Sequence, residues 1–315
     1  MSLPVWLRPA FQHLLQAMKQ QRVNHAPMLH GSIGIGKRLL AKAYAQRLLC
    51  RAQSDEACSV CEECLLFQAG SHPDFHAVSI VEGKQSISIE QIRELSVSLQ
   101  ISAHRSGFRV ALIEPSEAMT IAAANALLKT LEEPGGNTVI VLVVDDLSKV
   151  PATIRSRCQR MPVAAPSSEQ ARQFLAADLP DLEPETAEKL LQISAGAPML
   201  AKLRWQQGAL QQVEALEQGL KAIARGQASV ADVAAGQSDI ELALASLQRI
   251  VIGGLQKSLQ HEGPLPASLW DGFAETVQQA ALAYRRNPAL NGALLLTSVL
   301  VQWFDFTAFL RHSKA

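Results

Sequence analysis

Residues 28–40 read MLHGSIGIGKRLL. A short apolar run, typical of a β-strand, is followed by a glycine-rich turn and a helix-forming segment that extends to residue 49. Gly31, Gly36 and Lys37 fit the G-x-x-x-x-G-K pattern, in which backbone N–H groups wrap around phosphates while the lysine and the helix N-terminus add positive charge. The stretch therefore predicts a P-loop, with these three residues as the candidate nucleotide-binding positions.

The residue after the lysine departs from the P-loop pattern. That position normally holds Ser or Thr, whose hydroxyl ligates the Mg²⁺ ion that bridges the nucleotide phosphates. Here it is Arg38, whose guanidinium has only donors and cannot coordinate a cation. We therefore expect the loop to keep its fold without binding ATP productively. Two alternatives stay open for Lys37, a weak contact with a nucleotide phosphate or an anion site that is empty or takes an ion such as sulfate.

Length and composition limit the class of protein. The chain has 315 residues, enough for two or three domains, and its 48% hydrophobic and 18% charged content is that of a globular protein. Lys and Arg together number 29, as do Asp and Glu, so no overall basic field is available to hold nucleic acid. No signal-like or membrane-spanning apolar run is found. We expect a cytoplasmic protein with no membrane partner.

Four cysteines crowd into fifteen residues. Cys50, Cys58, Cys61 and Cys64 form a C-x7-C-x2-C-x2-C array, whose thiolates can close a tetrahedral shell around zinc. Because protein ligands would fill all four positions, the expected site is structural rather than catalytic. A redox pair or incidental buried cysteines are the alternatives. Cys158 lies far away in sequence and is given no metal role.

The order of apolar segments predicts the fold class. Strands alternate with helices over residues 1–164, which favours a doubly wound α/β domain with a parallel sheet. Beyond residue 165 strand signals vanish, and we expect a small helical domain over 165–205 and a helix bundle over 206–315. The strands expected after the P-loop strand are 74–80, 108–113, 138–144 and 159–163. The helices expected in the α/β domain are 11–19, 39–49, 89–99 and 118–131.

Three features together resemble a known family. Residues 125–134 read NALLKTLEEP, residues 156–158 read SRC, and the cysteine array interrupts the chain between the P-loop helix and the second strand. With the missing Mg²⁺ ligand, the chain resembles the delta-prime family of subunits of the bacterial DNA polymerase III clamp loader. The resemblance implies an AAA+ domain with a zinc module near residues 50–64, a helical lid and a C-terminal collar. Residues 206–315 match only in length and helical character.

A second site also departs from that of active members. After the strand 108–113, an active member would place an Asp that organises Mg²⁺ and then a Glu that polarises the attacking water. The chain has Glu114 and Pro115 there, and proline has no group to orient water. Glu117 is interpreted as a first-turn acid of the following helix. Glu114 could still help hold a cation. Loss of the metal-ligating hydroxyl at position 38 and of the water-orienting acid at position 115 is nevertheless expected to remove hydrolysis by this chain.

The resemblance implies a role for Arg157 of the SRC motif. In the family this arginine reaches across a subunit boundary to the γ-phosphate of ATP bound by the neighbour, where a guanidinium stabilises charge on the transferring group. Spacing alone would instead favour an arginine paired with a surface carboxylate. Arg155 is interpreted as a structural or interface charge.

The function implied is that of a non-hydrolysing subunit that helps load a sliding clamp onto primed DNA. Its expected partners are the motor (tau/gamma) and delta subunits in a hetero-pentamer, with clamp and primer–template DNA reached through the complex. One alternative is an active ATP-hydrolysing motor subunit, and another is a zinc-bearing DNA-binding protein. No set of polymerase carboxylates is found, so any classification as a DNA-directed DNA polymerase, a nucleotidyltransferase, would refer to the holoenzyme.

Overall fold

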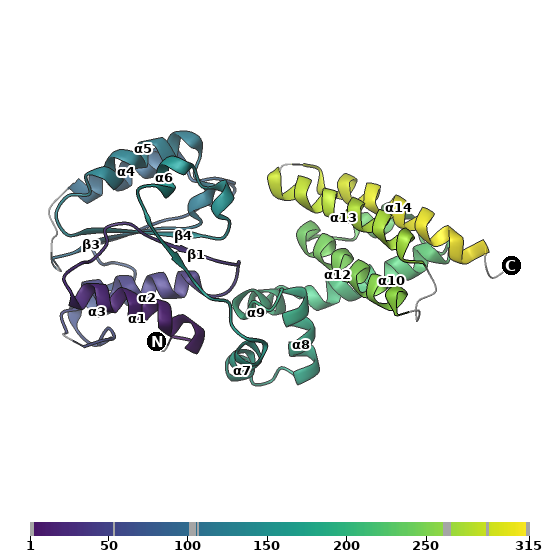
Figure 1. The fold of residues 1–315 in the computed structure, drawn as a ribbon, viewed down its shortest axis with the longest axis horizontal. Helices are drawn as coiled ribbons and strands as arrows, with labels where there is room; N and C mark the ends of the chain where they lie inside the picture. The colour runs from purple at the N-terminus through teal and green to yellow at the C-terminus, as the bar shows by residue number, and fades with distance from the viewer. Residues whose placement is uncertain are drawn as a thin grey trace. The chain divides into compact units, whose positions relative to one another are not determined.

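The computed structural model describes residues 3–52, 54–100, 105, 107–260, 266–287 and 290–312 (Figure 1). The chain divides into two compact units, Met1–Pro180 with Ala197–Leu200, and Asp181–Gly196 with Ala201–Ala315. The segment expected to form a small helical domain is shared between them. Helix α7 (Ser168–Asp178) belongs to the first unit and α8 (Pro184–Ile193) to the second.

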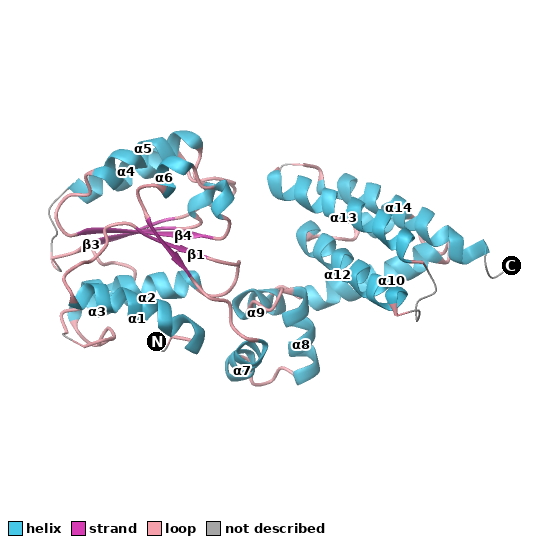
Figure 2. Ribbon diagram, viewed as in Figure 1, coloured by secondary structure: helices cyan, strands magenta, loops and turns pink. Residues whose placement is uncertain are grey.

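The first unit is built on a five-stranded parallel sheet with the strand order β2-β3-β4-β1-β5 (Figure 2). Every residue of β3 and β4 is buried, as expected for a parallel sheet covered on both faces. The α/β class predicted from the sequence is confirmed. The strands are β1 (Pro27–His30), β2 (Phe75–Val78), β3 (Arg109–Ile113), β4 (Thr138–Val144) and β5 (Gln159–Pro162).

Helices cover both faces of this sheet, as Figure 1 shows. Alternate strand residues point to opposite faces, so Leu29 and Val141 join the core on one side while Met28 and Ile140 join the core on the other. On the first side lie α1 (Arg8–Lys19), α2 (Lys37–Leu49) and α3 (Glu62–Gln68). On the second lie α4 (Ile89–Gln100), α5 (Ile121–Glu132) and α6 (Ala152–Arg155).

The helix expected over 118–131 begins later than predicted. Residues Ser116–Ala118 form a separate 3-10 turn, η2, and α5 starts at Ile121. The reason is Thr120, whose hydroxyl accepts the N–H of Ala123 at 3.1 Å and so caps the helix. The sequence pattern missed this cap because the apolar periodicity continues through it.

The described part of the second unit consists of helices joined by turns and loops, without a strand. Apolar residues predicted as helix stripes, among them Leu244, Leu247, Phe273 and Val277, form its core. Gly254 permits close packing there, because a Cβ at this position would lie 2.3 Å from Trp270. Among the helices of the described residues, none combines the length and the hydropathy of a membrane span. The helices after α8 are α9 (Pro198–Gln206), α10 (Ala209–Ala224), α11 (Val230–Ala235), α12 (Ile240–Leu259), α13 (Ala267–Arg286) and α14 (Gly292–His312).

Candidate nucleotide site and metal cluster

The glycine-rich loop joins the end of β1 to the start of α2, in the strand–turn–helix context that a P-loop requires. Gly34 and Gly36 have φ values of 74° and 98°, a left-handed backbone that glycine adopts without strain. A Cβ on Gly34 would lie 2.5 Å from the Cβ of Leu200. The N–H of Met199 donates to the carbonyl of Gly34 at 3.0 Å, so the segment 197–200 packs directly on the loop.

The P-loop lysine is bound by groups of its own chain. The Lys37 Nζ donates to the carbonyls of Gly31 and Ser32 at 2.7 and 2.6 Å, and it pairs with Asp145 Oδ1 at 2.5 Å. Its side chain is 3% exposed. Asp145 was missed by sequence reasoning, although its place directly after the buried strand β4 was a usable signal, because ligands of parallel sheets bind at the carboxyl ends of strands. The ammonium group is thus satisfied without a phosphate.

Two of the residues that depart from the active pattern, Arg38 and Glu114, pair with each other. Arg38 Nε lies 3.1 Å from Glu114 Oε2, so a guanidinium from α2 faces the carboxylate that ends β3. Burial raises the pKa of Glu114 and nearby Asp145 adds to that, while Arg38 lowers it. Arg38 therefore occupies one of the two positions from which an active site would ligate Mg²⁺, and its guanidinium faces the carboxylate at the other position. This pair borders a cavity of about 370 Å³ that Ile33, Val143 and Met199 also line.

Glu117 is fixed by the backbone after β4. Its Oε1 accepts the N–H groups of Asp145 and Asp146 at 2.8 and 3.2 Å, and burial raises its pKa. The interpretation of Glu117 as an acid of the following helix is corrected, because it lies in η2 and α5 starts beyond it. Its carboxylate joins the ends of β3 and β4 rather than orienting a water.

Arg157 lies outside the set of residues that line the P-loop cavity. Its Nε and Nη2 contact Glu132 Oε1 at 2.6 and 2.5 Å, and its Nη1 donates to the Thr153 carbonyl at 3.0 Å. The pairing with a surface carboxylate that spacing favoured is therefore present. The side chain is still 35% exposed. Arg155 differs, because its Nη1 donates to the Leu147 carbonyl at 3.4 Å.

The four cysteines of the array meet at one point. Their Sγ atoms all lie within 4.8 Å of one another, with 3.6 Å between Cys50 and Cys58 and 3.9 Å between Cys50 and Cys61. Zinc–sulfur bonds of about 2.3 Å in a tetrahedron require sulfurs about 3.8 Å apart. A disulfide would need about 2.05 Å, and all the cysteines are free. The cluster thus fits a metal ion, whose ligands would be Cys50, Cys58, Cys61 and Cys64.

Backbone N–H groups point at these sulfurs. The N–H of Cys58 donates to Cys50 Sγ and that of Cys61 to Cys58 Sγ, both at 3.3 Å. Such bonds favour the thiolate, the form that binds metal. The backbone N–H groups of Val60 and Cys61 lower the pKa of the Cys58 thiol to about 6. The backbone of this turn therefore favours negative charge on the sulfur of Cys58, whereas burial raises the pKa of the Cys64 thiol.

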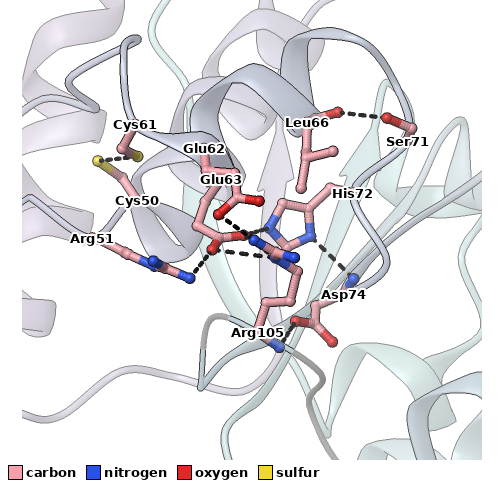
Figure 3. A network of polar contacts seen from close by, with 10 residues as sticks. All are labelled: Cys50, Arg51, Cys61, Glu62, Glu63, Leu66, Ser71, His72, Asp74 and Arg105. Carbon is pink, nitrogen blue, oxygen red and sulfur yellow. Dashed lines mark hydrogen bonds and ion pairs between the residues drawn. The ribbon is translucent and has the colours of Figure 1, made fainter.

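A buried carboxylate joins the cysteine turn to the sheet (Figure 3). Glu63 has a fully buried side chain, and its Oε1 lies 2.5 Å from Arg51 Nη2. Its Oε2 lies 3.2 Å from Arg105 Nε and 3.2 Å from His72 Nε2. His72 Nδ1 accepts the N–H of Asp74 at 3.0 Å, so the ring proton is on Nε2, facing Glu63. Burial lowers the His72 pKa and keeps the ring neutral.

The positions of these residues explain what the network connects. Arg51 follows Cys50, and Glu63 lies between Cys61 and Cys64, while Asp74 immediately precedes β2. Sequence reasoning missed Glu63, because an acid in the first turn of a short helix is usually a solvated charge. No sequence signal distinguished it from its exposed neighbour Glu62.

Comparisons with known proteins were made for the whole chain. A family model described as "DNA polymerase III, delta subunit" matches residues 6–167, a range that includes the P-loop, the cysteines and Arg157. DNA polymerase III subunit delta' of Pseudomonas aeruginosa is 34% identical, covering 89% of this chain and 91% of the relative. That of Escherichia coli is also 34% identical, covering 68% and 64%.

A relative named as a tau subunit and a solved structure extend the comparison. DNA polymerase III subunit tau of Bacillus subtilis is 33% identical over 47% of this chain and 26% of its own length. A crystal structure of a DNA polymerase III gamma subunit-related protein from Thermotoga maritima aligns with a TM-score of 0.51 and 18% identity, over 93% of this chain and 99% of that one. At this identity the likeness concerns the fold alone.

Proposed function

We propose that this chain, which belongs to the delta-prime family of DNA polymerase III subunits, is a clamp-loader subunit that does not hydrolyse ATP itself. The observation that carries the proposal is the ion pair of Arg38 with Glu114. This ion pair joins the two positions that would bind Mg²⁺. The cation that faces Glu114 is therefore the guanidinium of Arg38 and not a Mg²⁺ ion that can exchange. Without Mg²⁺ the charge on transferring phosphate lacks its main stabilising partner.

Two further contacts support the loss of hydrolysis. Lys37 is satisfied by Gly31, Ser32 and Asp145, so contact with a phosphate would require it to exchange these partners. Pro115 stands where a carboxylate would orient the attacking water, and Glu117 binds backbone N–H groups instead. Positioning and electrostatics provide most of phosphoryl-transfer catalysis, and each is impaired here.

The purified chain alone is expected to release no phosphate from ATP above the protein-free background, at saturating ATP and Mg²⁺. A steady-state phosphate-release assay measures this, with Lys37→Met as the matched variant, since Met retains the apolar stem of lysine. Equal and negligible rates for both proteins are expected. Steady turnover by the wild type that Lys37→Met abolishes would establish the alternative, an active motor subunit.

We assign Arg157 the role of an arginine finger that acts on ATP bound by a neighbouring subunit. It lies outside the P-loop cavity of its own chain and is one-third exposed, as a group that reaches another subunit must be. The partners proposed are motor (tau/gamma) and delta subunits in a hetero-pentamer that acts on a sliding clamp and primed DNA in the bacterial cytoplasm. Relatives named tau and gamma support that setting.

The domain roles belong to the same proposal. Residues 1–164 form an AAA+ body, 165–205 a lid and 206–315 a collar that holds the complex together. The helical second unit, with its own apolar core, is compatible with a collar. The body acts as a fixed platform because nucleotide exchange does not change its site.

We further propose that the cysteine cluster holds structural zinc. All four ligand positions come from the protein, so no position is open for water or substrate, and the ion would stabilise the turn between α2 and α3.

The purified chain is expected to carry about one equivalent of zinc, measured by elemental analysis. Cys64→Ser, which removes a buried ligand, should lower the zinc content, while Cys158→Ser outside the cluster should leave it unchanged. Far less than one equivalent, together with four thiols that react freely in residues 50–64, would contradict the proposal.

A further inference from the structure

We propose that Glu132 is the positioning residue of Arg157, an inference that rests on the proposed action of Arg157 at a neighbour's ATP. A guanidinium carries five N–H groups in a fixed plane. Glu132 Oε1 accepts from Nε and lies 2.5 Å from Nη2 as an ion pair, and Nη1 donates to the Thr153 carbonyl and to Ser156 Oγ. Every nitrogen of the group is thereby restrained by its own chain.

The edge of the guanidinium that Glu132 binds shows whether Glu132 positions Arg157 or blocks it from binding a phosphate. A carboxylate that took the place of a phosphate would engage the terminal edge formed by Nη1 and Nη2. Glu132 instead binds the Nε–Nη2 edge, and a second N–H of Nη2 remains at the tip. The carboxylate thus fixes the plane of the guanidinium and leaves its end available to an incoming phosphate.

The acceptors are attached to rigid elements. Glu132 is the last residue of α5, next to Leu131, which is 1% exposed. Thr153 and Ser156 flank Ile154 of α6, which is fully buried in the same apolar cluster as Leu131. Two helix ends anchored in one core therefore hold the guanidinium from two sides, which is the arrangement needed to keep a long side chain in one orientation.

Glu132→Ala should lower the rate at the neighbour's site rather than the stability of this chain. The carboxylate is about half exposed, and exposed ion pairs contribute little to folding. A misplaced catalytic group can lose up to about 100-fold in rate. Because Arg157 itself remains, we expect a smaller loss, about tenfold in kcat, with the KM for ATP unchanged.

The test uses the reconstituted complex with primed DNA and measures kcat and KM for ATP hydrolysis. Glu132→Ala should slow turnover at the one site that Arg157 serves by about tenfold, and Glu132→Gln, which keeps an acceptor oxygen, should recover part of it. Glu133→Ala is the matched control, since it removes the same charge one residue along from an exposed side chain; it should match the wild type. In an Arg157→Ala background, Glu132→Ala should cause no further loss.

The outcomes separate this inference from the proposed function. An unchanged or faster rate with Glu132→Ala, while Arg157→Ala is slow, would overturn the positioning role and leave the finger in place. An equal loss from Glu132→Ala in both backgrounds would also overturn it, because the effect would not pass through Arg157. If Arg157→Ala itself left the rate unchanged, the proposed function would fail first.

Discussion

Arg157→Ala is expected to slow ATP hydrolysis at the neighbouring subunit's site by about 10³-fold or more, although we propose that this chain itself hydrolyses no ATP. Arginine fingers contribute about 10³ to 10⁵ in rate in comparable enzymes, because a planar cation stabilises charge on the transferring phosphoryl group in a site that excludes water. Removal of the side chain deletes that charge and leaves nucleotide binding by the neighbour intact. The loss should therefore appear in kcat rather than in KM.

The measurement is a rapid-quench assay of the first DNA-stimulated turnover of the reconstituted complex. If one site depends on Arg157, the burst should lose that site's share while the other sites continue. Arg155→Ala is the matched control: it removes the same charge two residues away, from a side chain whose Nη1 donates to the Leu147 carbonyl. Unchanged hydrolysis and unchanged clamp loading with Arg157→Ala would remove the residue from the mechanism.

Glu63→Ala is expected to lower the free energy of unfolding by about 3 kcal/mol. Removal of one member of a buried ion pair costs about 3–5 kcal/mol, because its partners are left uncompensated. Here the side chains of Arg51 and Arg105 are 59% and 32% exposed, so water can partly replace the carboxylate. The loss of stability should therefore fall at the low end of that range. His72 also loses the carboxylate oxygen that lies 3.2 Å from its Nε2.

Urea unfolding in the presence of zinc measures this change. Glu62→Ala is the control, because Glu62 precedes Glu63 on α3 and contacts the same Arg105 with a side chain that is 61% exposed. An exposed pair contributes about 0–1 kcal/mol. Equal effects of the two substitutions would show that burial of Glu63 does not make its network important for stability.

Much of the fold could be predicted because its signals are local. Strands β3 and β4 lie between two helical layers, so burial on both faces makes them continuous apolar runs. The glycines and lysine of the P-loop mark a strand–turn–helix junction, and close cysteine spacing brings thiols together without help from the rest of the chain. The start of α5 was misplaced because one hydroxyl, that of Thr120, decided it.

The contacts that decide chemistry could not be predicted, because they join residues far apart in the sequence. The sequence shows that Arg38 and Glu114 depart from the active pattern, yet only the fold pairs them. Likewise Asp145 is an ordinary acid after a strand until β4 and β1 lie side by side and it meets Lys37. Ion pairs depend on tertiary geometry, which the spacing of apolar residues along the chain does not encode. The boundaries of the lid and collar also depend on tertiary geometry and stay predictions.

The central claim is that the P-loop of this chain takes no part in ATP hydrolysis while Arg157 promotes hydrolysis by a neighbouring subunit. The most direct test is DNA-stimulated ATP hydrolysis by two reconstituted complexes. One contains this chain with Lys37→Met and the other contains it with Arg157→Ala. We predict that the first complex hydrolyses ATP at the wild-type rate and that the second loses the turnover of one site. Loss of hydrolysis with Lys37→Met and full hydrolysis with Arg157→Ala would contradict the account.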